Sequence, residues 1–494
     1  MSTNLKQFRA DLTQPWLQAF MFIAAIPLFP EYISFFLVIP AVLLAWKDIR
    51  QQGRRIRLGL IGKLLLIYIG YMFITTLYSD NFMHSLATVG MWAFFFFLYL
   101  AIANLLTDTD RCDSLLLCIT AVAGIVGLIA CCQYRVGYFT ESNPIEFWGW
   151  LDKIVFEYIP LRIDNPPYVL RSCSTFNNPN VLAEYLMAVA PFVVYFNFCE
   201  RRKDIRLFCR ICLLLTLCGV LFSFSRGGYL VLIVLCLVLI VLNFRRRFAA
   251  VTMYLVSAFI LVPDEVIKRL VSIIPGIKVG GKVINSVTAS PQNDATSSAV
   301  SDVVDKVVSN VGNTGNVADT TPPPVVTTPA EIISNSEAGI AVNDRRSAWL
   351  ECLERFTERP LFGYGAGIQN TWDMLEEKGL EVVHAHNFVL QTLMEGGLIA
   401  LAIMGAIGFL VIRNGIRLMR SGHSRAFWMG FAVLMFAVAF VLHGLVDYPL
   451  LTPKLIANFM MILAIIERST PLYIDKGLPM PKNAPRKVLG ETNG

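Results

Sequence analysis

The sequence predicts an all-α polytopic membrane protein, and three observations lead to this fold class. The chain has 494 residues, of which 55% are hydrophobic and only 16% are charged, whereas soluble domains carry about 25% charged residues. Its mean hydropathy is +0.58. The apolar residues are gathered in blocks of about 15–25, the length needed to cross a hydrocarbon core of about 30 Å. These features exclude a soluble enzyme, a nucleic-acid-binding protein and a disulfide-stapled secreted domain.

The apolar blocks predict twelve transmembrane helices. Their expected ranges are 14–29, 31–46, 58–78, 84–106, 113–134, 181–198, 206–223, 228–244, 248–262, 387–412, 425–446 and 453–467. Because twelve crossings are an even number, both termini are expected on the same side of the membrane. The first helix follows basic residues but no small-residue cleavage site follows it, so we expect it to be retained and not removed as a signal peptide.

Basic residues mark one side of the predicted helices. Five fall in Lys47–Arg57, five in Arg201–Arg210 and more in 245–247 and 413–425, all on the side of the two termini. The short loops on the opposite side contain a single basic residue, Arg226. Since cytoplasmic loops are enriched in lysine and arginine, both termini are expected in the cytoplasm.

This topology divides the chain into three parts. Residues 1–262 hold the first nine helices with an outer loop near 135–180, residues 263–386 form a large outward loop, and residues 387–494 hold the last three helices and a cytoplasmic tail. The first outer loop contains the aromatic cluster Phe147–Trp150, which is typical of the lipid–water interface.

The large outward loop is expected to have a flexible middle and an ordered end. Residues 283–343 are rich in Ser, Thr, Val, Asn and Asp and lack aromatic residues, so they cannot bury enough apolar surface to fold. Residues 344–367 predict an amphipathic helix, with Trp349 and Leu353 on its apolar face, followed by a glycine-rich turn. Those glycines do not follow a strand, which argues against a nucleotide-binding loop and favours a tight turn at the membrane surface.

Two of the five histidines lie where the large outward loop re-enters the membrane. His384 and His386 come directly before Asn387 and the tenth predicted helix. A histidine at this point is in contact with water, lies next to lipid and titrates near neutral pH. It suits a general base that acts on a hydroxyl at the membrane surface, and the alternative is a polar residue at a helix cap.

Arginines on the outward side indicate an anion site. Arg171, Arg226, Arg345 and Arg346 are all predicted just outside the lipid. Arg226 lies between two apolar helices on the side that the topology rule disfavours, which is explained if its guanidinium binds phosphate oxygens. The alternatives are a snorkelling side chain or an ion pair with an acid such as Asp447. Together with the histidines, these arginines describe an outward site with several phosphate-binding groups and one base.

The eleven cysteines give little functional signal. Most fall inside predicted helices, where a cysteine acts as a small apolar side chain. Cys173 and Cys352 are predicted in outward loops, where a disulfide is possible. The sequence has no Cys/His spacing typical of a metal site, and no metal or cofactor is expected.

Four segments match known motifs in chain order. They are Arg171–Ala183 (R-x-x-G-x-F-x-N-P-N), Ser225–Gly228 (S-R-G-[GA]), Arg345–Gly365 (R-x-x-x-W…P-L-x-G-x-G) and His384–Gly397 (H-x-H-N…L-Q…E-x-G). Together they resemble the superfamily of O-antigen ligases and O-antigen polymerases, which are bacterial membrane glycosyltransferases. The resemblance covers about residues 170–400, and the last segment is the most specific. Two positions depart from the pattern. The glycine of the first motif is Ser174 here, and the ligase form of the last motif has Gly, Thr or Tyr where this chain has Ala400.

The resemblance implies a fold similar to the metal-independent GT-C-like glycosyltransferases and a location in the bacterial inner membrane. It also implies transfer of a glycan from undecaprenyl diphosphate to an acceptor hydroxyl on the periplasmic face, beside membrane lipid and without a nucleic acid partner. A diphosphate leaving group gains negative charge as the glycosyl bond breaks, so arginines in a partly dry site would stabilise it while a neutral histidine takes the proton of the acceptor.

Transferred to the matching positions, the resemblance implies a role for each candidate residue. His386 is the implied general base. The residues implied to bind diphosphate are Arg226, Arg345 and Arg171, and Arg346 is an alternative arginine for the same role. The residues implied to support them are His384, Asn387 and Asp447.

Several functions remain open at the level of sequence. The first is an O-antigen ligase whose acceptor is lipid A–core. An O-antigen polymerase, which acts on another glycan acceptor, and a protein O-oligosaccharyltransferase are alternatives within the superfamily. A twelve-helix secondary transporter is the alternative from another class, with faint support in Asp48–Arg55. Transporters place charges near mid-membrane, whereas the predicted helices contain almost no ionisable residue beyond Lys63.

Overall fold

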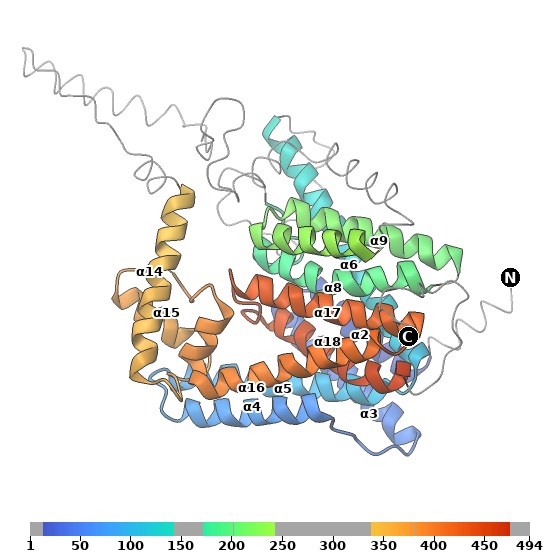
Figure 1. The fold of residues 1–494 in the computed structure, drawn as a ribbon, viewed down its shortest axis with the longest axis horizontal. Coiled ribbons are helices and arrows are strands. Elements are labelled where there is room, and N and C mark those ends of the chain that lie inside the picture. The colour runs from blue at the N-terminus through green and yellow to red at the C-terminus, as the bar shows by residue number, and fades with distance from the viewer. Residues whose placement is uncertain (1–12, 143–170, 201, 243–336, 381, 475–494) are drawn as a thin grey trace, which may run out of the picture.

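The computed structural model describes residues 13–142, 171–200, 202–242, 337–380 and 382–474, and every regular element in these ranges is a helix (Figure 1). Seven of the described helices are long and apolar enough to cross a membrane. They are α5 (Phe82–Leu105), α6 (Thr109–Ser142), α8 (Pro179–Cys199), α9 (Lys203–Phe222), α16 (Phe388–Met419), α17 (Ser424–Gly444) and α18 (Pro453–Ile474).

Shorter or more polar helices complete the bundle. They are α2 (Pro15–Ala25) with the 3-10 turn η1 (Ile26–Leu28), α3 (Glu31–Gln51), α4 (Leu60–Thr76) and the helix Arg226–Leu242. The predicted all-α membrane fold is therefore confirmed. Helices occupy eleven of the twelve predicted ranges in the described part of the chain. The twelfth range, 248–262, lies outside the described residues, so the count of twelve stays a prediction.

Two further predictions also fall outside the described residues. These are the aromatic cluster Phe147–Trp150 and nearly all of the segment 283–343. The helix predicted to begin at residue 344 is present as α14 (Glu337–Glu358), and a short helix, α15 (Gln369–Glu377), follows it. The predicted apolar face of α14 is partly wrong, because Leu353 is 46% exposed while Ala348 and Cys352 are buried.

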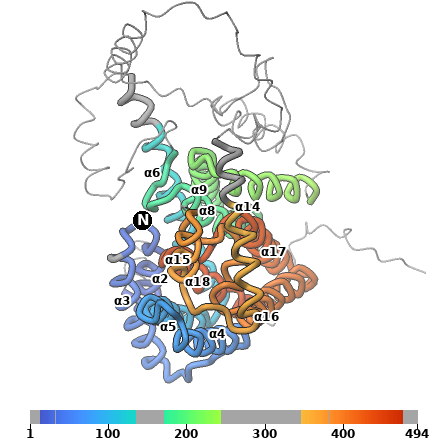
Figure 2. Tube along the Cα trace, turned by 90° about the vertical axis from the view of Figure 1, so that its left-hand side faces the viewer, coloured from blue at the N-terminus to red at the C-terminus, as the bar shows by residue number. Residues whose placement is uncertain are grey.

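The helical bundle has two chemically different ends. At one end α14 and α15 lie across the ends of the bundle helices, as Figures 1 and 2 both show. At the opposite end, Asp48 forms ion pairs with Arg54 (2.5 Å) and Arg111 (2.9 Å), and Arg425 pairs with Asp113. The basic loops thus gather at the end away from α14 and α15, as the orientation prediction requires. Which end faces the cytoplasm stays a prediction.

The glycine-rich turn after α14 packs on α16, so it is more than a turn at the membrane surface. Gly397 interrupts α16 with a φ of +62°, and a Cβ there would lie 2.4 Å from the carbonyl carbon of Leu361. Three backbone hydrogen bonds fix this contact, from Leu398 N to Pro360 O (2.9 Å), from Tyr364 N to Met394 O (2.7 Å) and from Gly365 N to Glu395 O (3.0 Å). The motif glycines therefore allow two backbones to approach closely.

The prediction that the spans contain almost no ionisable residue is wrong. Glu184, Glu395, His443 and Lys454 are all at most 5% exposed inside α8, α16, α17 and α18. Two of them have direct partners: Lys454 donates to Thr175 O at 2.5 Å, and Glu395 accepts from Gln391 Nε2 at 2.9 Å. These hydrogen bonds offset the cost of removing a charge from water.

Candidate active site

The start of α16 fixes the two motif histidines. Asn387 is its N-cap residue, and its side chain accepts from the backbone N–H groups of Val389 (2.9 Å) and Leu390 (3.1 Å). Such a cap satisfies N–H groups that the helix leaves free. His386 comes directly before it with a φ of +45°, a left-handed conformation that costs free energy outside glycine and persists only where neighbours enforce it.

Two long side chains hold the residue between the histidines. The Nε1–H of Trp349 on α14 donates to Ala385 O at 2.8 Å, and Ala385 N donates to Gln391 Oε1 at 3.1 Å. Ala385 is fully buried in a small cluster with Ala348 and Cys352 of α14. The outer helix therefore positions the histidine segment directly, which explains why the tryptophan and histidine motifs occur together.

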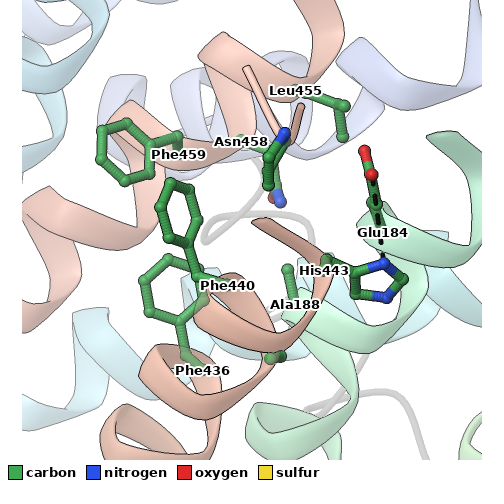
Figure 3. Close-up of a pocket in the computed structure, with 10 residues that line it drawn as sticks. Glu184, Ala188, Phe436, Phe440, His443, Leu455, Asn458 and Phe459 are labelled. Carbon is green, nitrogen blue, oxygen red and sulfur yellow. Dashed lines mark ion pairs between the residues drawn. The ribbon is translucent and has the colours of Figure 1, made fainter. Parts of the chain in front are cut away.

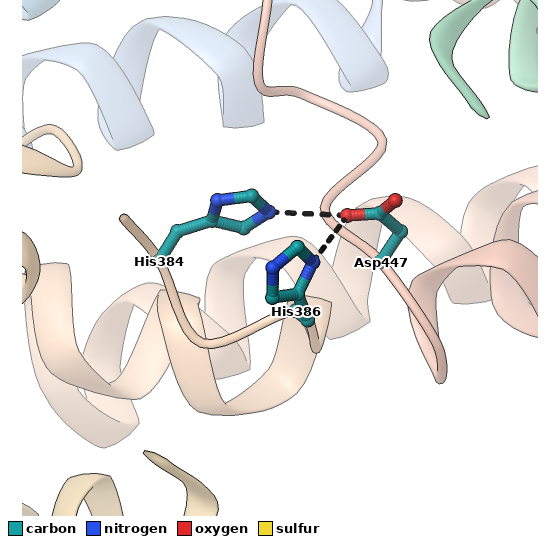
Figure 4. Close-up of side chains that lie close together, drawn as sticks. All are labelled: His384, His386 and Asp447. Carbon is teal, nitrogen blue, oxygen red and sulfur yellow. Dashed lines mark hydrogen bonds and ion pairs between the residues drawn. The ribbon is translucent and has the colours of Figure 1, made fainter. Parts of the chain in front are cut away.

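One carboxylate oxygen accepts a hydrogen bond from each of the two imidazole rings. Asp447 Oδ1 lies 3.1 Å from His384 Nε2 and 3.0 Å from His386 Nδ1 (Figure 4). An ionised carboxylate only accepts hydrogen bonds, so each ring must donate to it. Neutral His386 then carries its proton on Nδ1 and leaves Nε2 as a proton acceptor. Its side chain is 23% exposed, so the ring is partly open to solvent.

The hydrogen bonds of this cluster also influence the protonation states of Asp447 and His384. Burial by itself would raise the pKa of Asp447, but the hydrogen bonds from His384 and His386 outweigh it and hold that pKa below the usual range. Burial lowers the pKa of His384, and the charges of His386 and Arg345 act in the same direction, while Asp447 opposes them. The cluster therefore combines an ionised aspartate with a neutral His384 at neutral pH.

A chain of hydrogen bonds connects Arg171 to the same aspartate. Arg171 Nη2 donates to Asn180 Oδ1 at 2.8 Å, and Asn180 Nδ2 donates to Asp447 Oδ2 at 3.2 Å. Arg171 Nε also donates to Ser223 O at 3.1 Å. Asn180 was not predicted as a site residue, although the N-P-N motif that contains it was the available signal.

The position of Ser174 explains a departure from the family pattern. Its φ is +54°, which a glycine adopts without strain. In this chain hydrogen bonds hold the serine instead: Oγ donates to Val126 O at 2.6 Å, and the backbone N–H donates to Gln133 Oε1 at 2.7 Å.

Two other arginines lie beside the cluster. Arg226 begins the helix Arg226–Leu242, and a Cβ on the next residue, Gly227, would lie 3.0 Å from His443 Nδ1 and 3.1 Å from Val446. The start of that helix therefore packs against the turn that leads to Asp447. Arg345 lies one turn before Trp349 on α14, close enough for its charge to act on His384.

The predicted site residues thus fall into two groups. Arg171, His384, His386 and Asp447 are joined by hydrogen bonds, and Asn387 caps the adjoining helix. Arg226 and Arg345 lie beside this group. Arg346 is exposed, and no hydrogen bond or ion pair links it to the group within the described ranges.

The cluster has the ligand types of a metal site but the surroundings of an anion site. One ligand atom each from His384, His386 and Asp447 lie within 4.8 Å of one another, and imidazole and carboxylate suit zinc-like ions. Arg171 is joined to this carboxylate through Asn180, Arg226 begins a helix that packs against its turn, and the charge of Arg345 acts on His384. Glu184 adds a second carboxyl group close enough to interact with Asp447. The positive groups still outnumber the carboxyl groups, which favours an anion such as a diphosphate.

The possible disulfide between two outward cysteines does not form. Cys173 and Cys352 both carry free thiols, and Cys352 is buried in the cluster beneath α14. Burial raises the pKa of the Cys352 thiol to about 12, so this cysteine is an unreactive apolar side chain.

Fold and site together define a multi-pass membrane protein with a histidine–aspartate–arginine cluster at one end of its helical bundle. Residues 211–405 match the family model described as O-antigen ligase. This match runs from α9 through the Ser225–Gly228 turn and α14 into α16. This part of the chain is therefore similar to the O-antigen ligase family, as its motifs predict. No curated protein matches the chain.

Proposed function

We propose that the protein is an O-antigen ligase of the bacterial inner membrane, with both termini in the cytoplasm. It transfers a glycan from undecaprenyl diphosphate to a hydroxyl of lipid A–core on the periplasmic face. The observation that carries this proposal is the bifurcated contact of Asp447 Oδ1 with both histidines, because it selects one tautomer of His386. The family match supports the enzyme class and not the substrates.

In the proposed reaction His386 is the general base. Its Nε2 takes the proton of the acceptor hydroxyl while that oxygen forms a bond to the anomeric carbon of the glycan. The resulting imidazolium stays hydrogen-bonded through Nδ1 to Asp447, whose negative charge stabilises it. His384 donates to the same carboxylate and so fixes its orientation.

The arginines act on the leaving group. As the bond between the anomeric carbon and the diphosphate oxygen breaks, negative charge grows on the diphosphate. Arg226 begins a helix that packs against the turn leading to Asp447, and the charge of Arg345 acts on His384. These two arginines are the proposed diphosphate ligands, with Arg171 next and exposed Arg346 as a further contact. Undecaprenyl diphosphate leaves as the anion, and the proton leaves His386 for water.

The test is His386→Ala, expressed at normal level in a strain that lacks the native gene. Surface lipopolysaccharide and the lipid-linked glycan pool are measured together. We expect bare lipid A–core at the surface and long glycan on the carrier. His423→Ala is the matched control, because His423 lies at the opposite end of the bundle, before α17, and should support normal surface glycan. Unchanged surface glycan in the His386 variant would show that His386 is not the general base and serves only at the start of α16.

An O-antigen polymerase is the second candidate, favoured by Ala400. The ligase form of the last motif has Gly, Thr or Tyr at this position, whereas Ala400 is fully buried and lies against Gly396. The same experiment separates the two functions. Core that bears a single repeat unit in the His386 variant would indicate a polymerase, since ligation by another enzyme would then still occur.

A further inference from the structure

A buried polar cavity lies one helical turn below the candidate active site. Its polar residues are Glu184 on α8, His443 on α17 and Asn458 on α18, and its other walls are apolar (Figure 3). These three side chains are 5%, 3% and 5% exposed. The cavity measures about 20 Å³, which is room for about one water molecule.

The polar atoms of this cavity lack the partners that buried polar atoms require. Both carboxylate oxygens of Glu184, Nε2 of His443 and Oδ1 of Asn458 have no hydrogen-bond partner among the described residues. The contact between the two titratable side chains is too long for a hydrogen bond, because His443 Nδ1 and Glu184 Oε1 are 3.9 Å apart. An unpaired polar group away from water costs free energy, and such groups are rare in native proteins.

Hydrogen-bond counting identifies the missing group. A water molecule donates two hydrogen bonds and accepts up to two. Within this cavity it can donate to Asn458 Oδ1 and to one oxygen of Glu184, and it can accept from Nε2–H of His443. By its donors and acceptors, one molecule of the size that fits matches three of the four unpartnered atoms.

We propose that one water molecule bridges Glu184, His443 and Asn458, and that this bridge positions the turn that carries Asp447. The proposal rests on the function proposed above, because its consequence for catalysis passes through Asp447 and His386. Glu184 and His443 are positioning residues in this view, since neither contacts the reacting atoms.

The backbone connects the cavity to the active site. The carbonyl of His443 accepts from Val446 N at 2.9 Å and from Asp447 N at 2.8 Å, so the turn begins at His443 itself. On α8, Glu184 lies four residues after Asn180, which holds the other oxygen of Asp447. Residues four apart lie on the same face of a helix, so one face of α8 contacts both the aspartate and the cavity.

The same histidine also contacts the helix that begins at Arg226. A Cβ on Gly227 would lie 3.0 Å from His443 Nδ1. A shift of the His443 side chain would therefore move the aspartate turn and the start of this helix together. The bridge would thus act on the base and on a diphosphate ligand at once.

The test compares Glu184→Gln with Glu184→Leu in the purified full-length protein, with turnover measured on a lipid-linked glycan donor. Glutamine keeps a partner for the water and should leave kcat within about twofold. Leucine removes it, and kcat should fall by about 10- to 100-fold with KM unchanged, the range typical of residues that orient a catalytic group. Asn458→Leu removes another partner and gives the same test if Glu184→Leu does not fold. Wild-type kcat in a leucine variant would overturn the proposal.

The matched control is Thr470→Val on α18. Thr470 is 6% exposed and its hydroxyl also lacks a partner, but it does not line the cavity. Valine at this position should leave kcat and KM unchanged, and an equal loss there would mean that any buried polar group has this effect, against the proposal.

A second readout does not depend on the reaction. A density map of the wild-type protein that resolves ordered water should show one molecule between the three side chains, and this density should be absent from the map of Glu184→Leu. An empty wild-type cavity would overturn the inference even if His386→Ala abolishes transfer. Bound water together with an active His386→Ala would instead overturn the proposed function alone.

Discussion

At the scale of single residues, the site depends on how a few side chains are held. Asp447 accepts from two rings through one oxygen and from Asn180 through the other. The positive φ values of His386 and Ser174 both require outside support, which Asn387 and Gln133 provide nearby in the structure. These contacts produce a histidine of defined tautomer from residues that are far apart in the sequence.

Asp447→Asn should lower kcat by about 100-fold or more while the protein still folds. The neutral amide can donate to His386 Nδ1, which favours the tautomer with the proton on Nε2 and removes the acceptor atom. Turnover by the purified variant in vitro checks this expectation. Asp110→Asn is the control, because this aspartate is exposed near the start of α6 at the opposite end. A kcat near that of the wild type would mean that Asp447 does not select the tautomer.

Ser174→Gly should change the free energy of unfolding by less than about 1 kcal/mol. Glycine relieves a strain of about 1 kcal/mol at a positive φ but loses the hydrogen bond from Oγ to Val126 O, which contributes about 0.5–1.5 kcal/mol. Valine neither relieves the strain at a positive φ nor forms the hydrogen bond to Val126 O. Ser174→Val should therefore clearly lower the melting temperature in detergent. Equal stability of the two variants would show that the left-handed conformation is unimportant.

At the scale of elements, the outer helices and the bundle are connected through α16. The turn after α14 packs on the interruption at Gly397, and Trp349 of α14 holds Ala385. Tyr71 of α4 supports the same junction, since its hydroxyl donates to Gly396 O at 2.7 Å and lies 3.0 Å from Leu361 O. The histidine segment is thus held by α14 on one side and by α16 on the other.

Gly397→Ala should destabilise the junction by about 2 kcal/mol or more. The new Cβ would lie 2.4 Å from the backbone of Leu361, and alanine at a φ of +62° is strained as well. Gly405→Ala in the same helix meets no atom within 4 Å and should be neutral or slightly stabilising. Thermal unfolding of both variants in detergent checks the difference, and similar melting temperatures would contradict the close approach.

Trp349→Phe should lower kcat by about tenfold with little change in stability. Phenylalanine keeps the apolar contacts but lacks the N–H group that donates to Ala385 O, so the histidine segment loses one fixed point. Trp372→Phe is the control, because Trp372 is 39% exposed on α15. The expectation fails if both tryptophan variants turn over substrate at the wild-type rate.

At the scale of the whole molecule, the two ends of the bundle differ in their ionisable groups. One end gathers the ion pairs of Asp48, Arg54 and Arg111, and the other gathers the histidine–aspartate cluster under α14 and α15. The proposed function requires a fixed orientation, because the proposed lipid-linked donor meets the histidine–aspartate cluster from only one face.

Labelling of intact cells with a membrane-impermeant maleimide tests this orientation. Asp80→Cys lies in the exposed turn before α5, at the end near α15, and should be labelled from outside. Gln51→Cys lies at the exposed end of α3 among the basic residues and should be labelled only after the cells are broken. The parent protein with its native cysteines gives the background. The reverse pattern would place the histidine cluster in the cytoplasm.

The sequence by itself determined the fold class, the positions of the helices that the structure describes and the candidate residues. Helical apolar blocks are local, so their length and basic flanks are readable from composition. The histidines, Asp447 and most of the arginines were predicted as candidates from their residue type and the side of the membrane on which they fall. A helix over 344–358 could also be predicted from the sequence, because helical spacing of apolar residues is a local pattern.

Only the tertiary structure decided which of these residues meet. Residues 171 and 180 lie in one segment, whereas 386 and 447 lie in two others, and the packing of α8, α16 and α17 brings the three segments into one hydrogen-bonded chain. The buried Glu184 and His443 escaped the sequence prediction because a lone polar residue in an apolar run does not reveal its neighbours. Their surroundings depend on contacts between helices, which no local pattern encodes, since each contact joins positions far apart in the chain.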